Sequence, residues 1–208
     1  MTHPIPASTA AKLPLMEAFY TIQGEGAFTG HAAYFIRLGG CDVGCVWCDV
    51  KESWDFDAHP YVAADAIADE AARHPARIAV ITGGEPALHD LTELTAQLKA
   101  RNFQVHIETS GSSPLHGHFD WITLSPKKFK FPIAEAYSAA HELKIIVFNK
   151  SDLKWAEQEA TKVRPHCKLL LQPEWGKREQ MMPLITQYVM ANPQWHISLQ
   201  VHKYLDIP

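Results

Sequence analysis

Short apolar runs alternate with segments of helical period along most of the chain. Runs rich in β-branched residues predict strands at 34–38, 77–82, 103–108, 121–124, 142–147, 168–172 and 196–200. Between them, apolar residues recur at helical spacing and predict helices at 63–73, 91–101, 152–163 and 179–191. This alternation, with few hairpin turns, is typical of a mostly parallel sheet with crossover helices.

The chain length limits how far such a sheet can close. A closed eight-stranded barrel usually needs about 250 residues, and this chain has 208. We therefore expect an α/β fold with an incomplete (β/α)6-type barrel and a reduced set of helices. The segment 111–140 has little helical period and three prolines, which predicts a missing crossover helix there. No low-complexity linker divides the chain, so we expect one domain over residues 1–208.

Composition and charge limit the partners and the cellular location that we expect for the protein. The net charge is -4 and the densest basic stretch, at 127–130, is short, which disfavours nucleic acid as a partner. The segment Met1 to Leu15 has one lysine and no apolar core of a leader, and no apolar run is long enough to cross a bilayer. These features predict a cytoplasmic protein that does not bind membranes.

Unusual polar motifs follow the carboxyl ends of five predicted strands. They are a cysteine loop after 34–38, Gly83-Gly84-Glu85-Pro86, Thr109-Ser110-Gly111, Ser125-Pro126-Lys127 and Pro173-Glu174-Trp175. Because the carboxyl ends of parallel strands share one rim, and ligands bind at that rim, we expect these motifs to line a single cavity.

The cysteine loop carries the strongest chemical signal. Cys41, Cys45 and Cys48 form the pattern C-x3-C-x2-C. In a reducing compartment such a group indicates metal or redox chemistry rather than disulfides. A zinc site would need a fourth donor such as His59 or Cys167. An iron–sulfur cubane with three thiolates keeps one iron open, which can chelate the amino and carboxylate groups of a methionine moiety. Cys167 itself is expected to be a small core residue.

These residues resemble the radical S-adenosylmethionine (SAM) enzymes, whose C-x3-C-x2-C signature has an aromatic residue before its last cysteine, here Trp47. The stretch "GGEP" looks like the second motif of that family. In addition, "MEAFYTIQGEGAFTGHAAYFIRLGGCDVGCVWCD", "ITGGEP", "IETSG", "LSPK", "LQP" and "QVHKYLDIP" resemble, in order, the family of 7-carboxy-7-deazaguanine synthases over essentially the whole chain. The resemblance implies a carbon–nitrogen lyase that contracts the ring of 6-carboxy-5,6,7,8-tetrahydropterin, with loss of ammonia, on the way to queuosine and other 7-deazapurines.

The resemblance also implies the cofactors and their residues. A [4Fe-4S] cluster would be held by the three loop cysteines, and SAM would bind beside it. The residues implied for SAM are Trp47, Cys48, Asp49, Gly84, Glu85, Glu108, Ser110, Ser125, Pro126, Lys127, Gln172, Pro173, Glu174 and Trp175. No residue is assigned as a catalytic acid or base.

The substrate residues can be partly argued from chemistry. A pterin presents adjacent N–H donors, for which the carboxylate of Glu25 is a complementary acceptor, and Gln23 can both donate and accept. Arg37, in an apolar strand, suits a bound carboxylate, although pairing between Arg37 and Glu25 is an alternative. The resemblance places the C-terminus at the substrate. The full implied set is Ile22, Gln23, Gly24, Glu25, Arg37, Thr82, His202 and Pro208.

One position departs from the family pattern. The family usually has threonine after "C-D", where its hydroxyl helps to bind Mg²⁺, and this chain has Val50, which has no side-chain oxygen. Mg²⁺ needs oxygen ligands. The ion could bind through substrate and water, through Asp49 or Ser53, or be dispensable.

Two other functions are compatible with the cysteine spacing. A glycyl-radical activating enzyme shares the cysteine spacing but does not account for "TIQGEG" or "HKYLDIP", and a non-catalytic zinc or iron–sulfur electron-transfer module would not cleave SAM. The family resemblance further implies an electron donor such as flavodoxin and a homodimer.

Overall fold

A single nine-stranded sheet organises the chain. The computed structural model describes residues 11–208, so the prediction that the N-terminus lacks a leader falls mostly outside the described residues. The strand order is β3-β1-β2-β4-β5-β6-β7-β8-β9. The strands are β1 (Lys12–Ile22), β2 (Ala32–Leu38), β3 (Tyr61–Ala63), β4 (Ile78–Gly83), β5 (Gln104–Thr109), β6 (Trp121–Leu124), β7 (Glu142–Val147), β8 (Lys168–Pro173) and β9 (Trp195–Ile197).

Helices follow most of the parallel strands. They are α1 (Ala64–Ala72), α2 (Thr92–Ala100), α3 (Ala134–Ala139), α4 (Ser151–Ala160), α5 (Arg178–Ala191) and α6 (Val201–Leu205). At one edge of the sheet β3 pairs antiparallel with β1, and β1 pairs antiparallel with β2. The seven strands β2, β4, β5, β6, β7, β8 and β9 pair parallel in that order, which confirms the predicted mostly parallel α/β fold. Six of them have four or more residues, and the three-residue β9 extends the row by one beyond the predicted six.

The sequence pattern missed β1 and misplaced the end of β9. Strand β1 pairs antiparallel with β2, and its register shifts between Leu15 and Glu17. That bulge breaks the period of two by which a strand is recognised. Strand β9 was predicted at 196–200, but it ends at Ile197, after which the chain turns into α6.

The prediction that the segment 111–140 lacks a crossover helix is confirmed only between β5 and β6. The short helix α3 lies within the segment, after β6. No helix in the described part of the chain has the length and apolar character that crossing a membrane requires.

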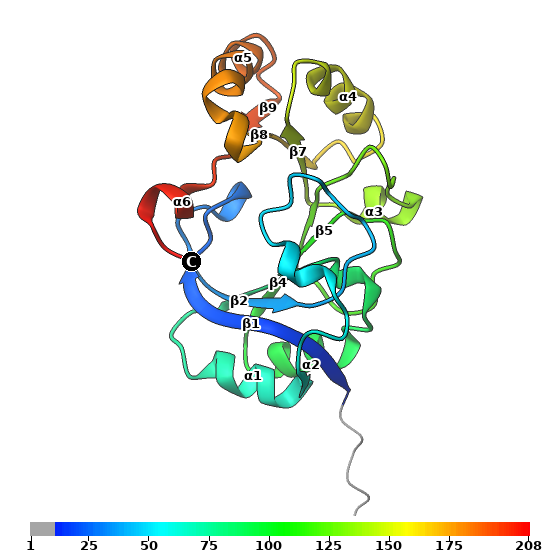
Figure 1. Ribbon diagram of the computed structural model, residues 1–208, viewed down its shortest axis with the longest axis vertical. Coiled ribbons are helices and arrows are strands. Elements are labelled where there is room, and N and C mark those ends of the chain that lie inside the picture. Colours follow the sequence, from blue (N-terminus) through cyan, green and yellow to red (C-terminus); the bar gives the residue numbers. More distant parts are fainter. Residues whose placement is uncertain (1–10) are drawn as a thin grey trace, which may run out of the picture.

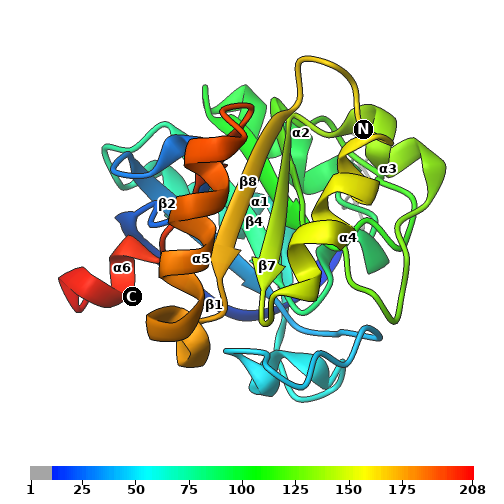
Figure 2. The ribbon, with the colours of Figure 1, turned by 90° about the horizontal axis from the view of Figure 1, so that it is seen from above.

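The sheet is curved, and the helices α1, α2, α4 and α5 cover its convex side (Figures 1 and 2). The buried apolar residues form two clusters there. One joins α1 and α2 to β2, β4 and β5, and the other joins α3, α4 and α5 to β6, β7 and β8. Each fully buried aliphatic side chain in these clusters contributes about 1.5–3 kcal/mol. The core therefore lies outside the curve of the sheet, which leaves the concave side for other residues.

Polar residues occupy the concave side because successive side chains of a strand point to opposite faces. In β5, Val105 and Ile107 belong to the outer core, whereas Glu108 lines the interior cavity. In β7, Leu143 and Ile145 belong to the outer core, whereas Lys144 lines the cavity. This alternation gives the curved sheet a charged interior.

Candidate active site

The glycine motif after β4 packs directly against the cysteine loop after β2. The backbone N–H of Gly84 donates to the Leu38 carbonyl at 3.0 Å, and that of Glu85 donates to the Gly40 carbonyl at 2.8 Å. A Cβ atom on Gly84 would lie 2.2 Å from the Gly40 carbonyl oxygen and 2.8 Å from the Cβ of Cys41. Only glycine allows this approach, so the two loops form one unit.

Glu85 fastens that unit to the loop after β5. The residue is 2% exposed, and its carboxylate accepts hydrogen bonds from the Thr109 hydroxyl at 2.5 Å, the Ser110 N–H at 2.7 Å and the Ala87 N–H at 3.0 Å. Three partners satisfy most of its acceptor capacity. Glu85 therefore holds the rim together, and a direct contact to a cofactor stays a prediction.

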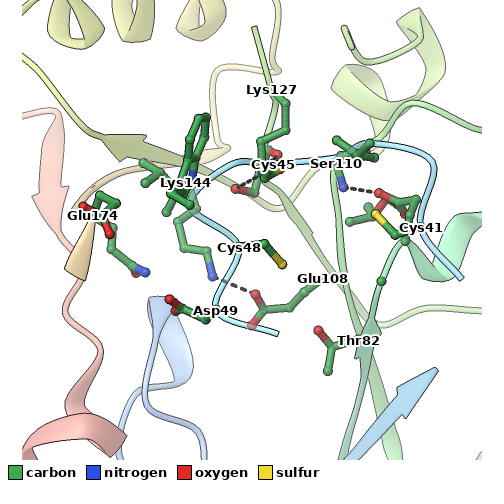
Figure 3. A pocket seen from close by; sticks show the side chains of 18 of the residues that line it. Cys41, Cys45, Cys48, Asp49, Thr82, Glu108, Ser110, Lys127, Lys144 and Glu174 are labelled. Atoms are coloured by element: carbon green, nitrogen blue, oxygen red, sulfur yellow. Dashed lines mark hydrogen bonds and ion pairs between the residues drawn. The ribbon is translucent and has the colours of Figure 1, made fainter. Parts of the chain in front are cut away.

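The three loop cysteines line one cavity of about 230 Å³ inside the rim (Figure 3). Neither candidate for a fourth protein ligand joins them. Cys167 is buried in the outer core, and the Nε2 atom of His59 lies 2.9 Å from the Glu52 carbonyl oxygen. A set of three thiolates fits a cubane with one open iron and leaves a tetrahedral zinc site incomplete.

Nearly all residues that the sequence assigned to SAM line this same cavity. Pro126 is the exception: it is buried between Ser125 and Lys127. The assigned residues that line the cavity are Trp47, Cys48, Asp49, Gly84, Glu85, Glu108, Ser110, Ser125, Lys127, Gln172, Pro173, Glu174 and Trp175. Five strand-end segments therefore converge on one cavity, as the rim argument predicted.

A second cavity of about 310 Å³ adjoins the first. It is lined by the assigned substrate residues and by Val50: Ile22, Gln23, Gly24, Glu25, Arg37, Val50, Thr82, His202 and Pro208. The two cavities share five lining residues, namely Glu25, Asp49, Thr82, Glu108 and Gln200. They are therefore two chambers of one cleft.

Lys144 lines the first chamber and pairs with two carboxylates that line both chambers, and the sequence interpretation missed it. Its ammonium pairs with the carboxylates of Glu25 and Glu108, the latter at 2.7 Å, and its side chain is 4% exposed. Gln23 donates to Glu108 at 3.1 Å and completes the group. Figure 3 shows Lys144 reaching across to Glu108 below Cys48. The signal was the alternation in "ELKII", where a lysine among strand residues marks the face turned away from the apolar core.

The pKa shifts of this group follow from burial and pairing. Burial alone would raise the pKa of Glu25, but the attraction of Lys144 outweighs it and the net pKa is lowered. Burial alone would lower the pKa of Lys144, but Glu108 and Glu25 raise it overall. Both groups therefore stay charged across the neutral range, with Glu25 held as a carboxylate.

Arg37 pairs with a residue other than Glu25. Its Nε atom donates to Glu17 on β1 at 2.6 Å, so the alternative of an Arg37–Glu25 pair is not observed. The ion pair with Glu17 uses only the Nε atom. The two terminal nitrogens of the guanidinium make no ion pair among residues 11–208. Arg37 lines the second chamber, where a guanidinium suits a bound carboxylate.

The C-terminal segment folds back over the second chamber. The N–H of Val201 donates to the Gly24 carbonyl at 2.9 Å, and the Thr21 hydroxyl donates to the Pro208 carbonyl at 3.1 Å. His202 packs so closely on Gly24 that a Cβ there would lie 2.2 Å from its Nδ1 atom. Burial lowers the pKa of His202, against the attraction of Glu25, so the ring is neutral at pH 7. The chain end therefore closes the chamber instead of fraying.

The oxygen donors around Val50 are only partly available to a Mg²⁺ ion. The Ser53 hydroxyl donates to the Val50 carbonyl at 2.7 Å and is buried. The Asp49 carboxylate accepts from Gln200 at 3.0 Å and pairs with Lys203 at 2.7 Å. Both contacts of the Asp49 carboxylate use Oδ2, so its Oδ1 atom has no hydrogen-bond partner among residues 11–208, although Lys203 already balances the charge of the group.

A curved parallel sheet with a three-cysteine loop at its rim and a glycine motif packed against that loop defines a radical SAM enzyme. The sequence profile of the Radical SAM superfamily matches residues 35–130. The chain is 60% identical over 196 residues to a 7-carboxy-7-deazaguanine synthase of Flavobacterium psychrophilum, covering 94% of this chain and 93% of the relative. It is 47% identical to a synthase of the same name in Synechocystis, covering 98% of each chain.

A solved structure agrees with the sequence relatives. The crystal structure of QueE from Escherichia coli matches with a TM-score of 0.83 and 32% identity, covering 92% of this chain and 95% of that one. The chain belongs to the 7-carboxy-7-deazaguanine synthase family. This membership confirms the resemblance seen in the sequence and favours it over an activating enzyme or a zinc module.

Proposed function

We propose that this chain converts 6-carboxy-5,6,7,8-tetrahydropterin to 7-carboxy-7-deazaguanine with loss of ammonia. The observation that carries the proposal is the continuity of the two chambers, one lined by the cysteine loop and the other by Glu25, Arg37 and the chain end. A radical made in one chamber can reach a hydrogen atom in the other only if the chambers adjoin. Family membership supplies the substrate class.

Cys41, Cys45 and Cys48 would hold the [4Fe-4S] cluster, with SAM beside it in the first chamber. When bound, the cluster and SAM supply a carbon-centred radical that abstracts a hydrogen atom from the substrate. The protein chain contributes position: the packed loops after β4 and β5 hold the rim rigid around the reacting groups.

The second chamber has complementary groups for each end of the substrate. Glu25, kept ionised by Lys144, can accept two N–H donors of the amino-pyrimidinone edge. Arg37 can bind the substrate carboxylate at the other end. His202 and the terminal Pro208 close the chamber over the ring.

The direct test is anaerobic incubation of the reconstituted enzyme with 6-carboxy-5,6,7,8-tetrahydropterin, SAM and dithionite, followed by mass spectrometry. We expect a product with the mass of 7-carboxy-7-deazaguanine that requires both SAM and substrate. Cleavage of SAM without that product would contradict the proposed substrate.

The Val50 position predicts turnover that does not depend on Mg²⁺. We expect the rate with EDTA to lie within about twofold of the rate with Mg²⁺, because Val50 has no side-chain oxygen and the Asp49 carboxylate is already paired with Lys203. The variant Val50→Thr restores a hydroxyl and is expected to respond more strongly to the ion. A steep Mg²⁺ requirement of the unchanged chain would contradict this prediction and would assign the ion to substrate oxygens and water.

The same family membership supports four wider proposals. The enzyme acts in the cytoplasm, as a homodimer, in the biosynthesis of queuosine and other 7-deazapurines. Its electrons come from a donor protein such as flavodoxin.

A further inference from the structure

An exposed apolar surface lies beside the cysteine loop. Val46, between two of the loop cysteines, is 76% exposed, and Phe129 is 51% exposed. The ring of Trp47 contacts both Phe129, with centroids 5.8 Å apart, and Phe148, at 6.1 Å. We call these four residues, Val46, Trp47, Phe129 and Phe148, the cysteine-loop patch. Three segments far apart in the sequence build it beside the cysteine loop: the loop itself, the segment after β6 and the turn after β7.

Lysines border the patch. Lys177 lies over the Phe148 ring at 5.6 Å. Lys128 and Lys130 flank Phe129, with side chains 42% and 32% exposed. Their acidic partners are Asp152 and Asp42.

Asp152 lies beneath the patch, where its carboxylate pairs with Lys128. The carboxylate is buried and accepts from the N–H groups of Phe148 and Asn149, both at 2.8 Å. In this pair the lysine side chain is 42% exposed and the carboxylate 6%, so the ammonium is the group nearer to solvent.

Asp42 is 42% exposed and offsets the charge of Lys130. Lys177 makes no ion pair among residues 11–208, so the basic border of the patch depends mainly on Lys177 and Lys128, although the whole chain carries a net charge of -4.

The chemistry of the proposed function requires such a surface, and the inference rests on that function. The cluster must receive one electron before SAM can be cleaved, and the electron has to enter from outside near the cysteine loop. An aromatic centre with a charged border is the usual anatomy of a protein interface. Complementary charge speeds the encounter of the partners and selects between them.

We propose that the cysteine-loop patch is the docking surface for an acidic one-electron donor protein of the flavodoxin class. A second copy of this chain is a poorer occupant. A two-fold interface would place the lysines of one patch against those of the other, and like charges in an interface are unfavourable.

The test compares two variants with a matched control. Phe129→Glu and Lys177→Glu place a negative charge in the patch, and neither residue contributes to the substrate chamber. Lys168→Glu makes the same change of charge at an exposed residue at the opposite, N-terminal end of β8. Binding of an oxidised bacterial flavodoxin to each holoenzyme is measured by calorimetry at low and high salt. Turnover is measured with reduced flavodoxin and, separately, with dithionite, which needs no docking surface.

We expect both patch variants to bind flavodoxin about tenfold more weakly, and high salt to weaken binding by the unchanged enzyme. Flavodoxin-driven turnover should fall with binding, whereas dithionite-driven turnover and the control variant should be unchanged. Unchanged flavodoxin binding, or equal losses with both reductants, would overturn the proposal. So would a change of oligomeric state in gel filtration, which would assign the patch to a second copy. Failure of the proposed function is distinguishable, because dithionite would then yield no product from the unchanged enzyme while flavodoxin binding still reports on the patch.

Discussion

Replacing Lys144 with methionine is expected to lower the free energy of unfolding by about 3–5 kcal/mol, because two buried carboxylates lose their shared cation. Glu25 and Glu108 would then repel each other, and one of them would take up a proton near neutral pH. The loss is measured by anaerobic urea denaturation followed by tryptophan fluorescence. Turnover should fall with it, and KM should rise more in Lys144→Met than in Lys144→Arg, which keeps the charge.

Lys99 offers a matched control for the loss of a lysine ion pair. It pairs with Asp120 at 2.7 Å, but both side chains are 36% exposed. Lys99→Met should therefore cost less than about 1 kcal/mol and leave turnover unchanged. If Lys144→Met and Lys99→Met were equally stable, Lys144 would not be the cation that neutralises Glu25 and Glu108. The inference that Lys144 keeps Glu25 ionised would then be wrong.

Replacing Cys48 with alanine is expected to abolish SAM cleavage, with a fall of about a thousandfold or more, equivalent to about 4 kcal/mol of activation barrier. One of three thiolates would be missing, so the reconstituted protein should also lose most of its iron. The measurements are iron and sulfide content after anaerobic reconstitution and 5′-deoxyadenosine formation by chromatography.

Cys167→Ala is the control for that variant. Cys167 is buried in the outer core, and burial raises the pKa of its thiol to about 11. Its replacement should leave iron content and SAM cleavage intact. If Cys167→Ala folds normally but loses its iron, the cluster must have a ligand outside the cysteine loop.

The positions of the site loops could be predicted from the sequence because they depend on local patterns. Apolar runs fixed β4, β5 and β8 to within one or two residues, and in parallel strands the residues that follow each run must meet at one rim. The chain end could be placed only by resemblance to a family, because nothing in the composition of the last eight residues says that Pro208 returns to Thr21, 187 residues earlier.

The ion pairs on the concave side of the sheet could not be predicted in the same way. Lys144 sits in a run that reads as an ordinary strand, and its two carboxylate partners come from segments 119 and 36 residues away. Pairings over such distances depend on sheet curvature, which no local pattern encodes. Arg37 illustrates the same limit, because its partner Glu17 lies on β1, the strand whose bulge concealed it from the sequence pattern.

The proposed chemistry requires that three thiolates hold a cubane whose remaining iron is open to SAM at the rim of the sheet. Electron paramagnetic resonance of the dithionite-reduced protein, recorded with and without SAM, tests it most directly. The account predicts a reduced-cluster signal that changes shape when SAM is added and is absent from Cys48→Ala. A signal that SAM leaves unaltered would show that a protein side chain already fills the fourth iron position, and would contradict the account.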